Sequence, residues 1–158
     1  MPDTPEEAGA RRAGPPDARV VARLLHDFNT EFETATPGTD ILARRLETLL
    51  AAPSTLAYLA GEPAVGVALV TLRSNVWYDG PVALLDELYV APAQRGRGFG
   101  TAIMRRLMAD AQALGVAAIE INVDEGDDGA QRFYERHSFS GADPDTGERA
   151  FFYFLELR

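Results

Sequence analysis

The chain of 158 residues contains no cysteine, and all 15 of its basic residues are arginine, so lysine is absent as well. The missing cysteine excludes disulfides, thiolate zinc sites and a cysteine nucleophile. No segment approaches the roughly 18 uninterrupted apolar residues of a membrane-spanning helix, and residues 1–7 lack the apolar run of a signal peptide. We therefore expect a cytoplasmic protein with no membrane partner.

Acidic residues outnumber basic ones by 24 to 15, which gives a formal net charge of −9. Nucleic acids and anionic membranes attract basic proteins, so neither is an expected partner. The negative charge suits a cationic partner such as an amine, and charge kept for solubility remains the alternative. Metal binding is not expected, because the acidic residues at 124–128 lack the spacing of a metal-binding loop.

Length and composition indicate one globular domain. Hydrophobic residues make up 46% of the chain and aromatic residues 9%, typical values for a folded domain. Residues 1–16 are rich in proline, glycine and charge, which predicts a flexible N-terminal segment with a short strand near Ala10–Ala13. Residues 17–158 form the expected domain.

The order of helical and strand patterns predicts an α/β (α+β) fold. Apolar spacing and the turn residues indicate helices over residues 17–33, 39–52, 101–114 and 129–137, and strands over residues 55–60, 65–73, 84–90, 116–123 and 150–157. A strand, a crossover helix and a second strand imply parallel neighbours with a right-handed connection. We expect a mixed central sheet with a parallel β-α-β core and helices on both faces.

The segment RGRGFGT at residues 95–101 lies between a predicted strand and a predicted helix. Glycines at alternate positions let the backbone curl tightly and let a ligand approach closely. The following helix would direct its unpaired N–H groups and its positive dipole end at an anion such as a pyrophosphate. A nucleoside-triphosphate loop would need a lysine, and the dinucleotide fingerprint has different glycine spacing, so neither standard nucleotide motif fits.

This segment resembles the signature loop [Q/R]-x-x-G-x-[G/A] of the GNAT superfamily of acetyl-CoA-dependent N-acetyltransferases. Three further features agree in order and spacing: the strand ending LYV before Pro92, a second strand at 116–123, and AQRFYERHSF at 130–139, close to A-x-x-x-Y-x-x-x-G-F. The chain departs from the family pattern at Asp127, where relatives usually carry Asn, and at Ser138, where they carry Gly.

The resemblance implies transfer of an acetyl group from acetyl-CoA to a primary amine, of a small molecule or a peptide, by direct attack in a ternary complex. It assigns the donor to the end of the key strand, to the glycine loop and to positions near the last helix. The residues concerned are Leu88, Tyr89, Val90, Arg95, Gly96, Arg97, Gly98, Phe99, Gly100, Thr101, Asp127 and Phe133.

For catalysis, the resemblance implies an acidic base on the key strand and a tyrosine that protonates the departing thiolate. Asp86 and Glu87 are adjacent, so regular alternation would turn them to opposite faces and leave one for the acceptor. The family position favours Asp86, Glu87 stays open, and a pair of carboxylates that only binds amine or solvent is the alternative. Tyr134 matches the tyrosine, with aromatic packing beside Phe133 as its alternative.

The acceptor is not identified by the sequence. The resemblance places its pocket at Phe28, Asn29, Glu31, Phe32, Trp77 and Tyr78. It also admits a homodimer formed through the last strand, with Phe151–Phe154. A non-catalytic acyl-CoA-binding or regulatory module of the same fold, and a phosphate-binding fold unrelated to CoA, remain alternatives.

Overall fold

The computed structural model describes residues 9–158, in two compact units that are described separately below: the chain up to Glu120, and Ile121–Arg158. The short strand expected near Ala10–Ala13 is present as β1 (Ala10–Ala13). Half of the segment expected to be flexible, residues 1–8, lies outside the described residues. The other half contains β1 and begins a turn of 3-10 helix at Pro15–Asp17.

The first unit is built on a mixed sheet of five strands in the order β1-β2-β3-β4-β5. The remaining strands are β2 (Thr55–Ala60), β3 (Gly66–Arg73), β4 (Val82–Val90) and β5 (Ala118–Glu120). Neighbours are antiparallel from β1 to β4, and β4 pairs with β5 in parallel. The mixed sheet predicted from the sequence is therefore confirmed.

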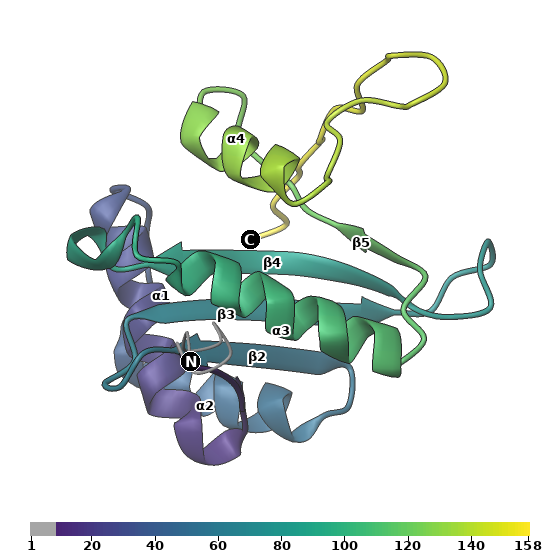
Figure 1. Cartoon of the computed structure of the whole chain (residues 1–158). Coiled ribbons are helices and arrows are strands. Elements are labelled where there is room, and N and C mark those ends of the chain that lie inside the picture. Colours follow the sequence, from purple (N-terminus) through teal and green to yellow (C-terminus); the bar gives the residue numbers. More distant parts are fainter. Residues whose placement is uncertain (1–8) are drawn as a thin grey trace, which may run out of the picture. The chain divides into compact units, whose positions relative to one another are not determined.

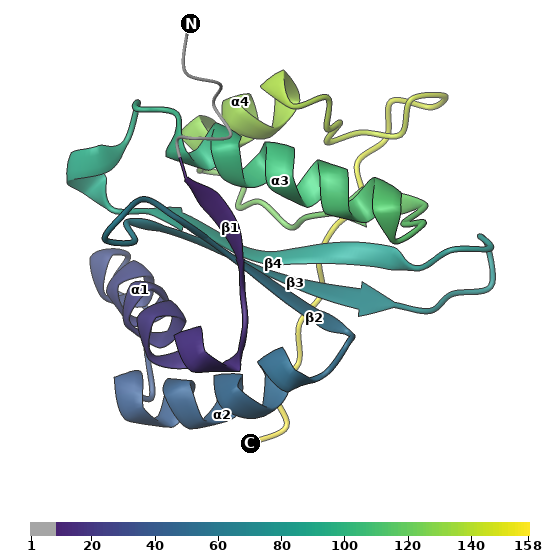
Figure 2. The same cartoon turned by 60° about the horizontal axis from the view of Figure 1, so that its bottom comes forward.

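Helices cover both faces of this sheet. On one face lie α1 (Ala18–Glu31) and α2 (Thr39–Ala51), and on the other lies α3 (Phe99–Ala113) (Figures 1 and 2). Strand β2 shows why both faces need cover, because all six of its residues are buried. Ala57 and Leu59 join the core under α1 and α2, whereas the Tyr58 hydroxyl donates a 2.9 Å hydrogen bond to Asp110 of α3.

Helix α3 connects the parallel strands β4 and β5 and ends before Gly115, whose φ of +70° favours glycine. Strand β5 is shorter than the predicted 116–123, because its ladder with β4 holds only the three pairs from Val82↔Ala118 to Leu84↔Glu120. Beyond Leu84, β4 runs on to Val90 with β3 as its strand partner in the described chain.

In the second unit, the predicted last helix is α4 (Asp128–Arg136). The Asp127 side chain caps it by accepting a 2.9 Å hydrogen bond from the Ala130 N–H. The strand expected over residues 150–157 was wrong: this segment forms no strand in the described structure. Apolar residues favour an extended chain, but a strand also needs a neighbour for its backbone hydrogen bonds, and the pattern cannot provide one. Among the helices of residues 9–158, none combines the length and apolar character needed to span a membrane.

Candidate functional site

The glycine loop of the first unit has the geometry of an open anion cradle. A turn of 3-10 helix at Pro92–Gln94 follows β4, and the chain then passes through Gly96 (φ +76°) and Gly98 (φ +86°). Gly98 is the N-cap of α3, so the helix begins at Phe99, two residues earlier than predicted. A Cβ built on either glycine meets no atom within 4 Å. Glycine is therefore required here by the backbone conformation, and the surrounding space is open for a phosphate.

The two arginines of the loop differ in their contacts. Arg95 donates two hydrogen bonds to the Glu31 carboxylate of α1, at 2.9 Å and 2.8 Å, and its Nε donates to the Val90 carbonyl at 2.9 Å. Arg97 is exposed and forms no side-chain ion pair with any residue that the structure describes. Both arginines were predicted to bind the donor. Among the contacts of residues 9–158, the guanidinium of Arg95 is paired and that of Arg97 has no ion pair.

A β-bulge interrupts β4 at the candidate base. Leu85 lies opposite Val70 and Glu87 lies opposite Leu69, so Asp86 between them has no partner on β3. Neighbouring residues of β3 face opposite sides of the sheet. Leu85 therefore faces the side of Val70, and Glu87 is switched to the side of Leu69.

The bulge corrects the prediction that Asp86 and Glu87 face opposite sides of the sheet. Thr71 shares the face of Leu69 on β3, and its hydroxyl donates a 2.6 Å hydrogen bond to the Asp86 carboxylate. Leu69 packs against the core beneath α1 and α2. Both carboxylates are thus presented on the α1 side, because the extra residue resets the alternation.

Of the two carboxyl groups, Glu87 has the shifted pKa. It is half-buried, whereas Asp86 is exposed. Burial, and secondly the negative charge of Asp86, raise the pKa of Glu87 above its usual range. A carboxylate with a raised pKa is a stronger base than an ordinary one, which suits it to proton abstraction.

Part of the predicted acceptor region gathers beside the end of β4. Phe28 of α1 packs on Tyr89 with ring centroids 5.0 Å apart, and on Phe32 at 5.3 Å. The Tyr89 hydroxyl donates a 3.2 Å hydrogen bond to Glu31. Burial and this contact with Glu31 raise the pKa of Tyr89. Asn29 has a local role, donating a 2.8 Å hydrogen bond to the Ala35 carbonyl in the turn after α1.

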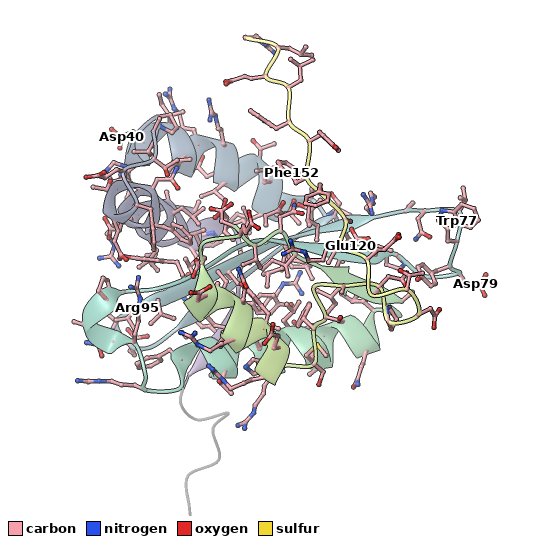
Figure 3. The ribbon with its side chains drawn as sticks, turned by 90° about the horizontal axis from the view of Figure 1, so that it is seen from above. Asp40, Trp77, Asp79, Arg95, Glu120 and Phe152 are labelled. Atoms are coloured by element: carbon pink, nitrogen blue, oxygen red, sulfur yellow. The ribbon has the colours of Figure 1, made fainter. Side chains whose placement is uncertain are left out.

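Trp77 and Tyr78 do not join this group. They lie in the loop between β3 and β4, and Trp77 is 85% exposed. The nine residues of β4 separate this loop from the glycine loop, about 26 Å at ~3.3 Å per residue. Figure 3 shows Trp77 and Arg95 at opposite ends of the sheet. Asn75 fixes the loop by accepting hydrogen bonds from the N–H groups of Trp77 and Tyr78.

The second unit contains Tyr134, the residue predicted to protonate the departing thiolate. Tyr134 is the buried residue of α4, and its ring meets Phe133 and Phe139 edge-on, with centroids 5.3 Å and 5.6 Å apart. The aromatic packing weighed as an alternative role is therefore present, and a catalytic role for the hydroxyl stays a prediction. Asp127, predicted to contact the donor, serves as the cap of α4.

Sequence reasoning missed Thr71 and the Arg95–Glu31 ion pair. Thr71 lies on a neighbouring strand and carries no motif, and Glu31 was assigned only to the acceptor pocket. No group of three or more potential metal ligands occurs within residues 9–158. Within residues 9–158 the first unit thus combines three features: an open glycine loop at the start of α3, an edge of β4 without a strand partner and a half-buried carboxyl of raised pKa.

The comparisons with known proteins identify the family. The model of the acetyltransferase (GNAT) family matches residues 20–139, so the chain belongs to the GNAT acetyltransferase family. No curated protein matches the chain significantly. A candidate acetyltransferase from Arthrobacter sp. FB24 is 50% identical, with 94% of this chain and 95% of that chain covered and a TM-score of 0.88.

More distant structures share the fold. The aminoglycoside acetyltransferase meta-AAC0020 from an uncultured soil metagenomic sample, in complex with sisomicin, is 17% identical, with a TM-score of 0.78 over 98% of this chain and 100% of that chain. An integron cassette protein from the mobile metagenome of Cole Harbour Salt Marsh is 25% identical, with a TM-score of 0.79 over 98% and 95% of the two chains. These likenesses support the fold class.

Proposed function

We propose that this chain is an N-acetyltransferase that transfers the acetyl group of acetyl-CoA to a primary amine within a ternary complex. The bulge at Asp86 is the observation that carries the proposal. It places a half-buried carboxyl of raised pKa, Glu87, on the strand that leads to the glycine cradle. An acyl-transfer site needs this combination, a base next to a place where the donor is held.

The donor fits the residues present at the end of β4 and in the loop. The open cradle at Gly96 and Gly98, the N-terminus of α3 and Arg97 would hold the pyrophosphate. Past Leu84, β4 has an edge without a strand partner among the described residues. Its outward N–H groups are suited to hold the pantetheine arm and to meet the charge that develops on the thioester oxygen.

The base has to remove a proton from the amine. An alkylamine of pKa about 10.4 is mostly protonated at pH 7, and deprotonation then costs about 4–5 kcal/mol. The raised pKa of Glu87 narrows the gap between its pKa and that of the amine. Asp86 adds a negative charge that attracts the cationic acceptor. The geometry therefore favours Glu87 as the base and Asp86 as its electrostatic partner, the reverse of the family position.

The chemical step balances with residues of this chain. Glu87 first takes one proton from the ammonium form, directly or through water, and releases it to solvent. The neutral amine nitrogen then bonds to the acetyl carbon, and its second proton passes to Glu87 by the same route. The carbon–sulfur bond breaks, and the thiolate takes a proton, for which Tyr134 is the proposed donor. With thiol and phenol pKa values of about 8.5 and 10, full transfer is uphill by roughly 2 kcal/mol, so a strong hydrogen bond from Tyr134 is an equally useful form of this assistance.

The test measures thiol release from acetyl-CoA with a panel of a simple alkylamine, a polyamine, an aminoglycoside and a peptide with a free α-amine. We expect turnover with at least one amine. Tyr134→Phe should lower kcat about 100-fold with little change in the KM of the amine. Tyr153→Phe makes the same chemical change at an exposed position and should have no effect.

The outcomes separate the proposal from its alternatives. If CoA binds and raises the melting temperature but no amine in the panel is acetylated, a non-catalytic acyl-CoA-binding module replaces the enzyme. If CoA does not bind and another nucleotide does, the glycine loop belongs to a different phosphate-binding function.

A further inference from the structure

The side chain of Arg95 bridges α1 and the end of β4. Its Nη2 donates to both oxygens of the Glu31 carboxylate, at 2.9 Å and 2.8 Å, and its Nε donates to the Val90 carbonyl at 2.9 Å. The guanidinium also lies over the Tyr89 ring, 5.7 Å from its centroid. Tyr89 in turn donates its hydroxyl hydrogen bond to Glu31. Glu31 is therefore held by two residues that frame the end of β4, and Figure 3 shows where Arg95 lies.

The Val90 carbonyl lies on the side of β4 that is turned away from β3. In a trans peptide group the C=O and the N–H point in opposite directions. The N–H of Ala91, in the same peptide group, donates a 2.8 Å hydrogen bond to Val65 beside β3. The Val90 carbonyl thus faces the edge where β4 has no strand partner among residues 9–158, and Arg95 fixes that edge at its end.

The charge of Arg95 is balanced by this arrangement. Hydrogen bonds between two ionised groups are stronger than those between neutral groups, and the further bond from Nε to the Val90 carbonyl fixes the orientation of the guanidinium. The Arg95 and Glu31 side chains are 45% and 26% exposed, so the pair is partly shielded from water. Arg97, two residues further on, has no ion pair with the described residues. The loop thus contains one neutralised arginine and one available for an anion.

We propose that Glu31 is a positioning residue for the acyl donor. By holding Arg95 on the Val90 carbonyl it sets the end of β4, where the pantetheine arm is expected, and it leaves phosphate binding to Arg97 and the loop backbone. This inference rests on the proposed function for the identity of the donor. It replaces the two predictions that Arg95 binds phosphate and that Glu31 lines the acceptor pocket.

The test compares two donors, acetyl-CoA and S-acetylpantetheine, which lacks the phosphates. Glu31→Gln should raise the KM of both donors by about tenfold, the effect of losing a charge-assisted hydrogen bond, with a smaller change in kcat. Arg97→Gln should raise the KM of acetyl-CoA only. In the double variant Glu31→Gln/Arg95→Gln, the loss should not exceed that of Arg95→Gln alone, because Glu31 acts through Arg95.

A matched control is Asp40→Asn, which removes the other α1 ion pair, Arg19–Asp40 at 3.0 Å, and should leave both KM values unchanged. The sign of the effect is decisive. If Arg95 were a phosphate ligand, Glu31→Gln would free it and tighten acetyl-CoA binding; tighter or unchanged binding overturns the proposal.

Calorimetric titration with CoA keeps the two proposals apart. Weaker CoA binding by Glu31→Gln supports the positioning role even if the wild type acetylates no amine, in which case only the proposed function fails. If the wild type does not bind CoA, both fail. Should Glu31→Gln melt well below Asp40→Asn, Tyr89→Phe, which removes one hydrogen bond to Glu31, is the second variant: a several-fold weaker affinity for CoA supports the role, and an unchanged affinity overturns it.

Discussion

The two halves of β4 differ in their neighbours and in what they offer to a ligand. Val82–Leu84 pairs with β3 on one edge and β5 on the other, and Val82 and Ala83 are buried. After the unpaired Asp86, Glu87–Val90 pairs with β3 alone among the described strands, and this second half carries both carboxylates. A strand paired on both edges has satisfied its backbone groups, whereas the half with an open edge keeps groups for binding. The bulge at Asp86 thus separates the half of β4 that is paired on both edges from the half that carries the candidate catalytic carboxylates.

The largest effect is expected from Glu87→Gln in the second half. This change keeps the size of the side chain and removes the base, so kcat/KM should fall about 100- to 1,000-fold while thermal stability is retained. Steady-state kinetics with saturating acetyl-CoA measure it. Glu47→Gln, on the exposed side of α2, is the control, and a wild-type rate in Glu87→Gln would assign the base to Asp86 or to water.

A substitution beside the first half of β4 should lower the free energy of unfolding and leave the rate of catalysis unchanged. A Cβ on Gly80, just before β4, would overlap the carbonyl oxygen of Gly115 in the backbone that leads to β5. Gly80→Ala should therefore cost about 3 kcal/mol of unfolding free energy, or roughly 6–12 °C in Tm. Denaturant unfolding and calorimetry measure the loss, and kcat/KM well below the transition should be retained.

Gly141→Ala is the matched control for Gly80→Ala, because a Cβ there meets no atom within 4 Å. It should shift Tm little. Equal stability of the two variants would contradict the close approach of Gly80 to Gly115. A large loss of kcat/KM in folded Gly80→Ala would contradict the division of β4 into two halves.

The smallest effect is a shift of pH dependence in Asp86→Asn. Asp86 is the second cause, after burial, of the raised pKa of Glu87. Removing its charge should lower the pKa of Glu87, so that the base stays ionised at lower pH and the acid limb of kcat/KM moves to lower pH. Because Glu87 remains half-buried, the pKa that defines the acid limb should stay above the usual pKa range of a glutamate.

The control for this shift is Asp79→Asn, the same change of charge in the exposed loop before β4 (Figure 3). A profile of kcat/KM against pH for both variants gives the comparison. If the acid limb moves in Asp79→Asn as far as in Asp86→Asn, the cause is the net charge of the protein and the pairing of the two carboxylates at the bulge plays no part.

The sequence predicted the elements better than their contacts. The glycine spacing at residues 95–101, the apolar periods and the turn residues depend on local backbone preferences, so the strands up to Val90 and the helices lie within a few residues of their predicted bounds. The strand expected over residues 150–157 was wrong, because pairing needs a partner that the segment's own sequence does not specify.

The candidate site shows the same limit. Asp86 and Glu87 were identified as the acidic pair, but their common face depends on the bulge, which appears only when β4 is aligned with β3. Trp77 and Phe28 were grouped by analogy, and the length of β4 keeps them apart.

The sequence by itself determined the family, the mixed α/β class and the conformation of the glycine loop, because each depends on short-range spacing and on what glycine permits. Tertiary structure alone decided which acid is half-buried, which arginine of the loop is neutralised, and that Glu31 contacts Arg95. Those properties arise from distances between residues far apart in the chain, such as the 2.8 Å between Arg95 and Glu31, and burial and charge pairing follow from such distances.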